Sequence, residues 1–284
     1  MTRFTVGELD VTMLDAGHVL LDGGAMFGVV PKVLWERERS PDDKNRITLA
    51  LNLMLIDDGK QKILVDTGAG DKAKEKTRSI YGLSGLGASD LLAPVGLRPD
   101  DIDLVINTHL HFDHAGGNTA FDSSGELVPA FSNARYVVQQ REIDAVRWDH
   151  PRMKTAYVQD DFRTLLDDPD RLQVVEGPHD LGNGIELVPA PGHTQGSQRV
   201  DLREGNARWS YVADLIPTAS HLRPNYVMSF DVEPLITIET KMALVAEAAR
   251  ENWKIIFEHD TDYTVITLEE TANGVRPLPV DLES

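Results

Sequence analysis

The sequence predicts an α/β fold in which helices cover layers of β-sheet. Short apolar strands alternate with helical stretches along the chain, and several His and Asp residues stand where a strand gives way to a loop. The composition also suits a large core, because 41% of the 284 residues are hydrophobic and 26% are charged. Those proportions exclude a disordered or fibrous chain.

The N-terminal part is expected to form strands and tight turns. Residues 4–14 and 49–56 have strand character, and the turn Asp57-Asp58-Gly59 leads into a further strand at 61–65. Turn residues that tolerate positive φ between two β-rich runs are typical of a hairpin. Residues 20–46 form a long insertion between the first two strands.

The rest of the chain alternates strands with helices. Strands are expected at 102–107, 135–139, 172–176, 185–189, 197–202, 207–213 and 254–257, and helices at 88–92, 141–148 and 238–251. The last helix is the best defined, because its Ala and Leu residues recur at helical spacing. No repeat or Ser/Gly linker interrupts the pattern. We therefore expect one domain over residues 1–284, with a loop-helix region at 141–171.

Charge and cysteine content narrow the function. The 28 Lys and Arg residues against 46 Asp and Glu give a net charge of -18, which disfavours binding to nucleic acid. The chain has no Cys, so any metal must be held by His, Asp or Glu. No leader and no stretch near the roughly 18 apolar residues of a membrane span is evident. A cytoplasmic protein with a small-molecule substrate and no membrane partner is expected.

The most informative segment runs from Thr108 to Gly117. It places His109, His111, Asp113 and His114 within a few residues of one another, directly after a predicted strand. Imidazole nitrogen and carboxylate oxygen suit Zn²⁺, and also Fe²⁺, Mn²⁺ or Co²⁺. In a loop, the first two side chains point one way and the last two toward a neighbouring point. The segment therefore predicts two adjacent metal ions held by these side chains.

Further ligand candidates follow predicted strands later in the chain. His193 lies in Pro191-Gly192-His193-Thr194, Asp214 follows the strand at 207–213, and His259 follows the strand at 254–257. Asp66 ends an earlier strand. Two interpretations of Asp66 carry equal weight: a hydrogen-bond partner for a metal-binding His, or the cap of a turn.

Together these residues resemble the metallo-β-lactamase superfamily over nearly the whole chain. The resemblance rests on Val65-Asp66-Thr67-Gly68, the His109 to His114 motif, Pro191-Gly192-His193-Thr194, Asp214 and His259, in the family's order. It implies a four-layered αβ/βα sandwich with two metal ions. In the implied assignment one ion is held by His109, His111 and His193, the other by Asp113, His114 and His259, and Asp214 bridges them.

The same resemblance implies a hydrolase. A metal-bridging hydroxide attacks a carbonyl or phosphoryl centre while one metal polarises the oxygen that becomes negative. Asp113 and Asp214 are then the catalytic carboxylates, with Asp113 guiding the proton toward the leaving group. Two ions are expected as cofactors, zinc first, with iron, manganese or cobalt as alternatives.

The segment from His109 to Gly117 is most similar to the N-acyl homoserine lactonases and the methyl parathion hydrolases. A lactone is therefore the expected substrate. One departure favours aryl esters or organophosphate triesters, because Pro217 stands where the lactonases carry a Tyr three residues after the bridging Asp. His221 or Tyr226 would be a substitute donor. A mononuclear iron enzyme like persulfide dioxygenase, a glyoxalase II-like enzyme and a non-catalytic metal-binding scaffold are the alternatives.

Substrate contacts are expected from segments without strand periodicity. The apolar and aromatic residues there are Met26, Phe27, Trp148, His150, Met153, Tyr157 and Phe162. Such side chains line acyl or aryl pockets, and ordinary packing under long loops is the alternative for each. The residues selected as contacts are Phe27, Trp148, Tyr157 and His221. The insertion at 20–46 fits a lid or an interface with a second copy in a homodimer.

Overall fold

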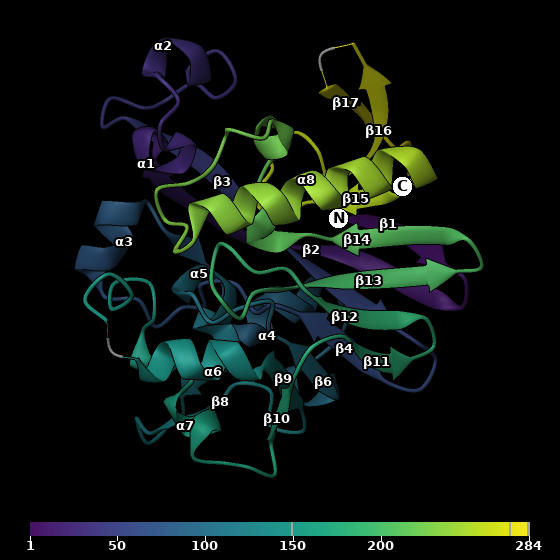
Figure 1. Cartoon of the computed structure of the whole chain (residues 1–284). Helices are drawn as coiled ribbons and strands as arrows, with labels where there is room; N and C mark the ends of the chain where they lie inside the picture. Colours follow the sequence, from purple (N-terminus) through teal and green to yellow (C-terminus); the bar gives the residue numbers. More distant parts are fainter. Residues whose placement is uncertain (149, 273, 283–284) are drawn as a thin grey trace. The chain divides into compact units, whose positions relative to one another are not determined.

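A computed structural model of the chain describes residues 1–148, 150–272 and 274–282 (Figure 1). The described residues form two compact units. The first contains Met1–Val19 and Leu51–Gly177, and the second contains Leu20–Ala50 and Pro178–Leu282. Each unit combines strands with helices, which confirms the predicted α/β class. The single-domain organisation stays a prediction.

The first sheet has the strand order β1-β2-β3-β4-β6-β9-β10, and β5 pairs with β2. Its strands are β1 (Thr2–Val6), β2 (Leu9–Asp22), β3 (Arg46–Asp57), β4 (Lys62–Val65), β5 (Ser84–Gly85), β6 (Leu104–Ile106), β9 (Arg135–Gln139) and β10 (Leu172–Val175). The strands β4, β6, β9 and β10 run parallel to one another, whereas β4 pairs antiparallel with β3. Their C-terminal ends therefore lie at one edge, where Asp66 and His109 follow β4 and β6.

The prediction of one strand over residues 4–14 was wrong. Gly7 adopts a positive φ of 61° and starts a turn that separates β1 from β2. The two strands then pair antiparallel, with Val6 opposite Leu9. The alternation of apolar residues changes phase at this turn, from Phe4 and Val6 to Leu9 and Val11, and this break is the signal of the hairpin that the prediction missed.

The other elements of the first unit are short. They are the helices α3 (Glu75–Tyr81), α4 (Ala88–Leu92), α5 (Phe112–Ala115), α6 (Gln140–Arg147) and α7 (Arg163–Leu166), and the paired strands β7 (Thr119–Phe121) and β8 (Leu127–Pro129). Helix α6 and helix α4 confirm two predicted helices. Helix α3 was not expected, because its sequence is polar and buries no residue.

The second sheet belongs to the second unit. Its strands, in spatial order, are β11 (His179–Gly182), β12 (Ile185–Pro189), β13 (Gln198–Glu204), β14 (Ala207–Tyr211), β15 (Lys254–Ile256), β16 (Val265–Thr271) and β17 (Gly274–Pro279). Helix α8 (Pro234–Glu251) runs along this sheet (Figure 1). Its Leu244 and Ala248 pack with Ile255 and Ile266 in one buried cluster.

Helix α8 begins at Pro234, before the predicted start at residue 238. Proline suits the first turn of a helix because its missing N–H has no partner there in any case. The helix ends where Asn252 takes a left-handed conformation. Among the described residues, no helix has the length and apolar character needed to cross a membrane.

The insertion folds onto the second unit, to which residues 20–46 belong. It contains α1 (Gly23–Phe27) and α2 (Lys32–Trp35). Arg39 then reaches the loop that follows His259, with contacts of 2.5 Å to Asp260 and 2.7 Å to Asp262. Both the guanidinium of Arg39 and the carboxylate of Asp260 are largely buried, so this ion pair is weakly screened. The insertion is therefore fixed to the segment that carries one of the candidate ligands.

Candidate metal centre

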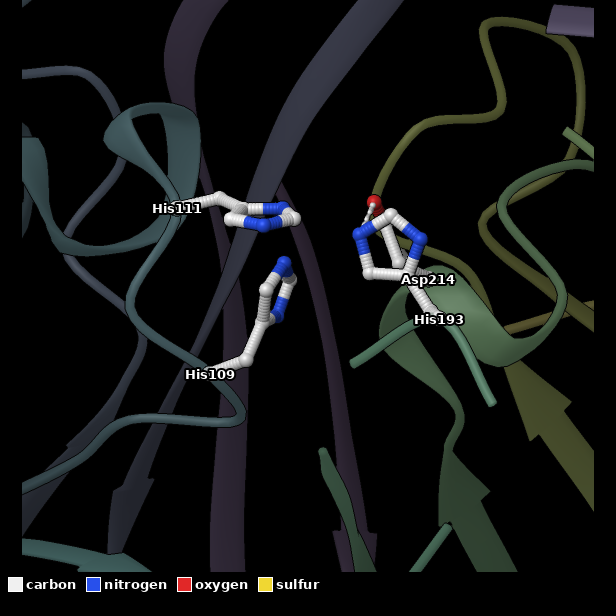
Figure 2. Close-up of side chains that lie close together, drawn as sticks. All are labelled: His109, His111, His193 and Asp214. Atoms are coloured by element: carbon white, nitrogen blue, oxygen red, sulfur yellow. Dashed lines mark ion pairs between the residues drawn. The ribbon is translucent and has the colours of Figure 1, made fainter. Parts of the chain in front are cut away.

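The first unit carries the His109 to His114 motif directly after β6. The loop turns into α5, so that Asp113 and His114 lie in its first turns, and all four candidate ligands are buried. The rings of His109 and His111 meet edge to face at 4.6 Å between centroids (Figure 2). His109 and His114 are 4.0 Å apart by the same measure. Three imidazoles thus gather at the end of one strand.

Asp66 organises this cluster from the end of β4. Its two carboxylate oxygens accept hydrogen bonds from the backbone N–H and the hydroxyl of Thr108, both at 2.7 Å. The oxygen that accepts the hydroxyl also lies 3.0 Å from Nδ1 of His114. Asp66 adopts a positive φ of 55°, a conformation that non-glycine residues rarely take. The carboxylate is therefore held where it contacts a candidate ligand, as a hydrogen-bond partner would be.

These contacts fix the tautomers of two rings. The single hydroxyl proton of Thr108 goes to Asp66, so the Thr108 oxygen accepts at 3.1 Å from Nδ1 of His109. The Asp66 oxygen that accepts from the Thr108 hydroxyl also accepts from Nδ1 of His114, so this nitrogen donates as well. In both neutral rings the lone pair then sits on Nε2. Metal-binding histidines are commonly oriented in this way by a partner on the other nitrogen.

The second unit repeats this arrangement at the ends of β12, β14 and β15. Nδ1 of His193 lies 2.8 Å from Asp231, and Nδ1 of His259 lies 2.8 Å from the carbonyl oxygen of Ala50. Carbonyl and carboxylate oxygens accept, so both Nδ1 atoms donate. The lone pair of each neutral ring again sits on Nε2.

Asp214 stands between those two rings. Its Oδ2 lies 3.0 Å from Nε2 of His193, shown by the dashed line in Figure 2, and its Oδ1 lies 2.9 Å from Nε2 of His259. Two neutral rings would present lone pairs to a carboxylate, which is repulsive. Each contact therefore needs a positive charge, either a second proton on the ring or a bound cation. Buried imidazole and carboxylate donors of this kind fit a divalent metal ion.

Local backbone conformation places the second-unit candidates. Ala213, next to Asp214, has a positive φ of 43°, which is strained for a residue with a Cβ. Gly192, next to His193, has a φ of 135°, and a Cβ there would lie 2.5 Å from the backbone of Thr237. Only glycine satisfies both conditions at position 192. The strain and the close approach both occur beside candidate ligands.

Asp231 is a residue of this centre that the sequence did not point to. It lies in the segment before α8, far along the chain from His193, with no motif around it. The backbone joins the two loops as well, because Val232 and Glu233 donate to the carbonyls of His193 and Gly192. The only signal in the sequence is an Asp shortly before a helix, which is too common to identify a partner.

The proposed substrate contacts have different environments. Phe27 is buried and stacks on His221 at 4.9 Å, and Nε2 of His221 donates to the carbonyl of Met26. Burial lowers the pKa of His221 to about 4, so its ring is neutral near pH 7. Tyr157 is buried against His111, at 4.8 Å between rings, whereas Trp148 is exposed.

Lys241 of α8 supports the segment that leads to Asp231. Its side chain is buried, and its Nζ donates to the carbonyls of Tyr226 at 2.7 Å and Arg223 at 3.1 Å. Burial lowers the pKa of Lys241 to about 8, while the negative charge of Asp231 opposes that shift. Burial of the charged ammonium therefore lowers the free energy of unfolding.

The lowered pKa of Lys241 predicts that the free energy of unfolding depends on pH. Between pH 8 and 10.5 the folded protein has lost the Lys241 proton and the unfolded chain still holds it, so the free energy of unfolding rises with pH. The rise is at most about 3 kcal/mol. Chemical denaturation of the wild type and Lys241→Met at intervals across this range measures it. The difference between the two proteins should shift in favour of the wild type as pH rises, and a difference that is constant with pH would contradict the buried charge.

Comparison with known families decides the relationship. Residues 48–259 match the model of a family described as the metallo-beta-lactamase superfamily, which covers most of the chain. The chain belongs to this superfamily. The predicted family is thus confirmed, and the matched residues run from β3 to His259.

Individual relatives agree with the family. An N-acyl homoserine lactonase of Bacillus cereus is 26% identical over 211 residues, which are 70% of this chain and 74% of that protein. A solved structure of a probable metal-dependent hydrolase from Staphylococcus aureus is 27% identical, covers 99% of this chain and 100% of its own, and has a TM-score of 0.87. The fold is also that of AidC, a dizinc quorum-quenching lactonase, with a TM-score of 0.79 at 21% identity over 99% and 98% of the two chains. The chain is a metal-dependent hydrolase of this fold.

Proposed function

We propose that this hydrolase opens a small, neutral lactone with the help of two divalent metal ions, with zinc as the preferred metal. The observation that carries the proposal is Asp214, whose two oxygens each face the Nε2 atom of a different imidazole. A carboxylate with that environment suits a bridge between two cations. The Nδ1 partners of both rings support the same interpretation, because they present each ring in the tautomer that a metal ion requires.

The proposed ligand set is the one that the resemblance to the superfamily implies. His109, His111 and His193 hold one ion, Asp113, His114 and His259 hold the other, and Asp214 bridges them. All seven are buried, and their donors are imidazole nitrogens and carboxylate oxygens, which suit zinc, iron, manganese and cobalt. Bound there, the ions would supply an activated water and polarise the ester carbonyl.

The protein groups supply orientation and proton transfer. Asp66 and Asp231 keep His114 and His193 in the tautomer whose Nε2 faces the centre. Asp113 would take the proton of the attacking water on a carboxylate oxygen and return it to the alkoxide oxygen that forms, still attached to the product, when the ring C–O bond breaks. No protein nucleophile is required for this reaction.

One residue favours a second candidate, the hydrolysis of aryl esters or organophosphate triesters. Pro217 is buried three residues after Asp214 and offers no hydroxyl to a lactone carbonyl. The substitutes considered from the sequence already have other contacts: the nitrogens of His221 contact Thr218 and Met26, and the Tyr226 hydroxyl accepts from Arg223. The lactonases among the relatives support the lactone as the first choice.

A parallel assay separates these candidates. Protein loaded with zinc is given an N-acyl homoserine lactone, a phenyl ester and paraoxon at equal concentrations, and kcat/KM is measured for each. We expect the lactone to have the highest value. Faster turnover of paraoxon or the phenyl ester would replace the lactone by the second candidate. Oxygen consumption with a thiol substrate by protein that holds one iron, without hydrolysis, would overturn both.

A further inference from the structure

Helix α6 of the first unit contains a carboxylate in an unusual place. Glu142 lies in the first turn of this helix and is fully buried, on the same face as Ile143 and Val146. A buried carboxylate is costly unless it accepts hydrogen bonds or faces a cation. An acidic residue in the first turn is favoured by the helix dipole, but that effect does not explain why the side chain points inward. Its contacts give the explanation.

Two hydrogen bonds of Glu142 connect it to the loop that carries His109 and His111 and to Tyr157 beside that loop. Its Oε1 accepts at 2.9 Å from the backbone N–H of Leu110 and at 2.7 Å from the hydroxyl of Tyr157. Leu110 is the residue between His109 and His111, so the carboxylate fixes the peptide that joins two candidate ligands. Charge-assisted hydrogen bonds of this kind are stronger than neutral ones.

Tyr157 holds the same loop from its other side. Its ring meets the ring of His111 at 4.8 Å and an angle of 63°. The neighbouring Ala156 accepts at 3.0 Å from the backbone N–H of Phe112. One buried carboxylate, one phenol and one backbone bond therefore restrain the backbone and the ring of His111 together.

We propose that Glu142 is a positioning residue for the metal ligands His109 and His111, and that its negative charge raises their affinity for a cation. The inference rests on the proposed function, because it assumes that these two imidazoles bind an ion. Tyr157 relays the effect to His111, and so acts on the centre without touching the substrate. The tyrosine selected from the sequence as a substrate contact is assigned a different role here.

Two variants separate charge from geometry. Glu142→Gln keeps an oxygen that accepts from Leu110 and Tyr157 but removes the charge. Tyr157→Phe keeps the ring beside His111 but removes its hydroxyl. Asp144→Asn is the matched control, because it removes a carboxylate from the same helix at an exposed position. Each protein is freed of metal and titrated with Co²⁺, whose visible absorption reports both affinity and coordination geometry.

The expected result is that Glu142→Gln binds Co²⁺ about tenfold more weakly than the wild type, in the range typical of lost partners of metal ligands. Tyr157→Phe should bind several-fold more weakly with a shifted absorption band, and Asp144→Asn should match the wild type. Circular dichroism confirms folding of each protein. Should Glu142→Gln not fold, Tyr157→Phe decides the matter by the same measurement.

Unchanged Co²⁺ affinity and absorption in a folded Glu142→Gln or, in its place, Tyr157→Phe would overturn the inference. An equally large loss of Co²⁺ affinity in Asp144→Asn would overturn it too, since removal of any carboxylate from helix α6 would then weaken metal binding. A wild type that does not bind Co²⁺ at all would instead contradict the proposed function. Failure of the inference and failure of the proposed function thus give different results.

Discussion

Replacing Asp214 with Asn is expected to lower kcat/KM for lactone opening by more than about a hundredfold, above the range seen when only an outer partner of a metal ligand is lost. The side chain keeps its size, but one oxygen becomes an NH₂ group and the negative charge is lost. The two oxygens that face His193 and His259 can then no longer bind one metal ion each. Metal analysis of the purified variant should show less than the wild-type content.

Asp201→Asn is the matched control for this substitution. Asp201 is also a buried carboxylate of the second unit, but it accepts from Ser210 at 2.7 Å and pairs with Arg199 and Arg208. Its loss should lower the stability of the protein and leave the metal content of the folded molecules unchanged. Equal metal content and activity in Asp214→Asn and the wild type would remove Asp214 from the centre.

Removal of the metal ions is expected to lower Tm by roughly 5 to 15 °C. A ligand present at about a thousand times its Kd stabilises the folded state by about 4 kcal/mol, and each kcal/mol corresponds to a few degrees for a chain of this size. The reason here is specific, because Asp214 and the two rings that face it lose the cation that relieves their repulsion. Calorimetry before and after dialysis against a chelator measures the change.

Selective restoration of Tm provides the control. Adding Zn²⁺ after the chelator is removed should restore the original Tm, whereas Mg²⁺ should not, because it prefers an octahedral set of oxygens. A Tm that stays the same after metal analysis has verified complete removal would mean that these residues do not depend on a cation. Restoration by Mg²⁺ alone would contradict the imidazole-based ligand set.

The candidate ligands were predictable because each follows a strand. His109, His193 and His259 come directly or shortly after β6, β12 and β15, where a sheet edge exposes polar side chains of successive segments. The clustered motif around His111 added chemical specificity that single residues lack. Order along the chain and residue type therefore suggested these residues, and their role as metal ligands stays a prediction.

The residues that support these ligands were not predictable in the same way. Asp231 and Glu142 reach His193 and Leu110 across 38 and 32 positions of sequence. Arg39 likewise acts on the loop after His259 from the other end of the chain. A lone charged residue near a helix gives no indication of its partner, which depends on tertiary packing. Asp66 is the exception, because its position at a strand end drew attention to it.

The strands also divide into those that the sequence predicted and those that it did not. Strands with mostly buried, apolar residues, such as β6 and β15, were predicted within a few residues of their observed ends. The strands β16 and β17 were missed, because their exposed residues include Glu269, Glu270 and Arg276, and Glu269 pairs with Arg276 across the hairpin instead of packing in a core. Charged cross-strand pairs stabilise a hairpin without producing an apolar pattern.

The central proposal, that the chain uses two metal ions to hydrolyse an ester-like substrate, is tested most directly by titrating metal-free protein with zinc. Lactone opening and bound zinc are measured on the same samples. We predict that activity rises to a plateau at about two zinc ions per chain, as a bridged two-metal site requires. A plateau of bound metal at one ion per chain, or full occupancy by two ions without hydrolysis, would contradict it.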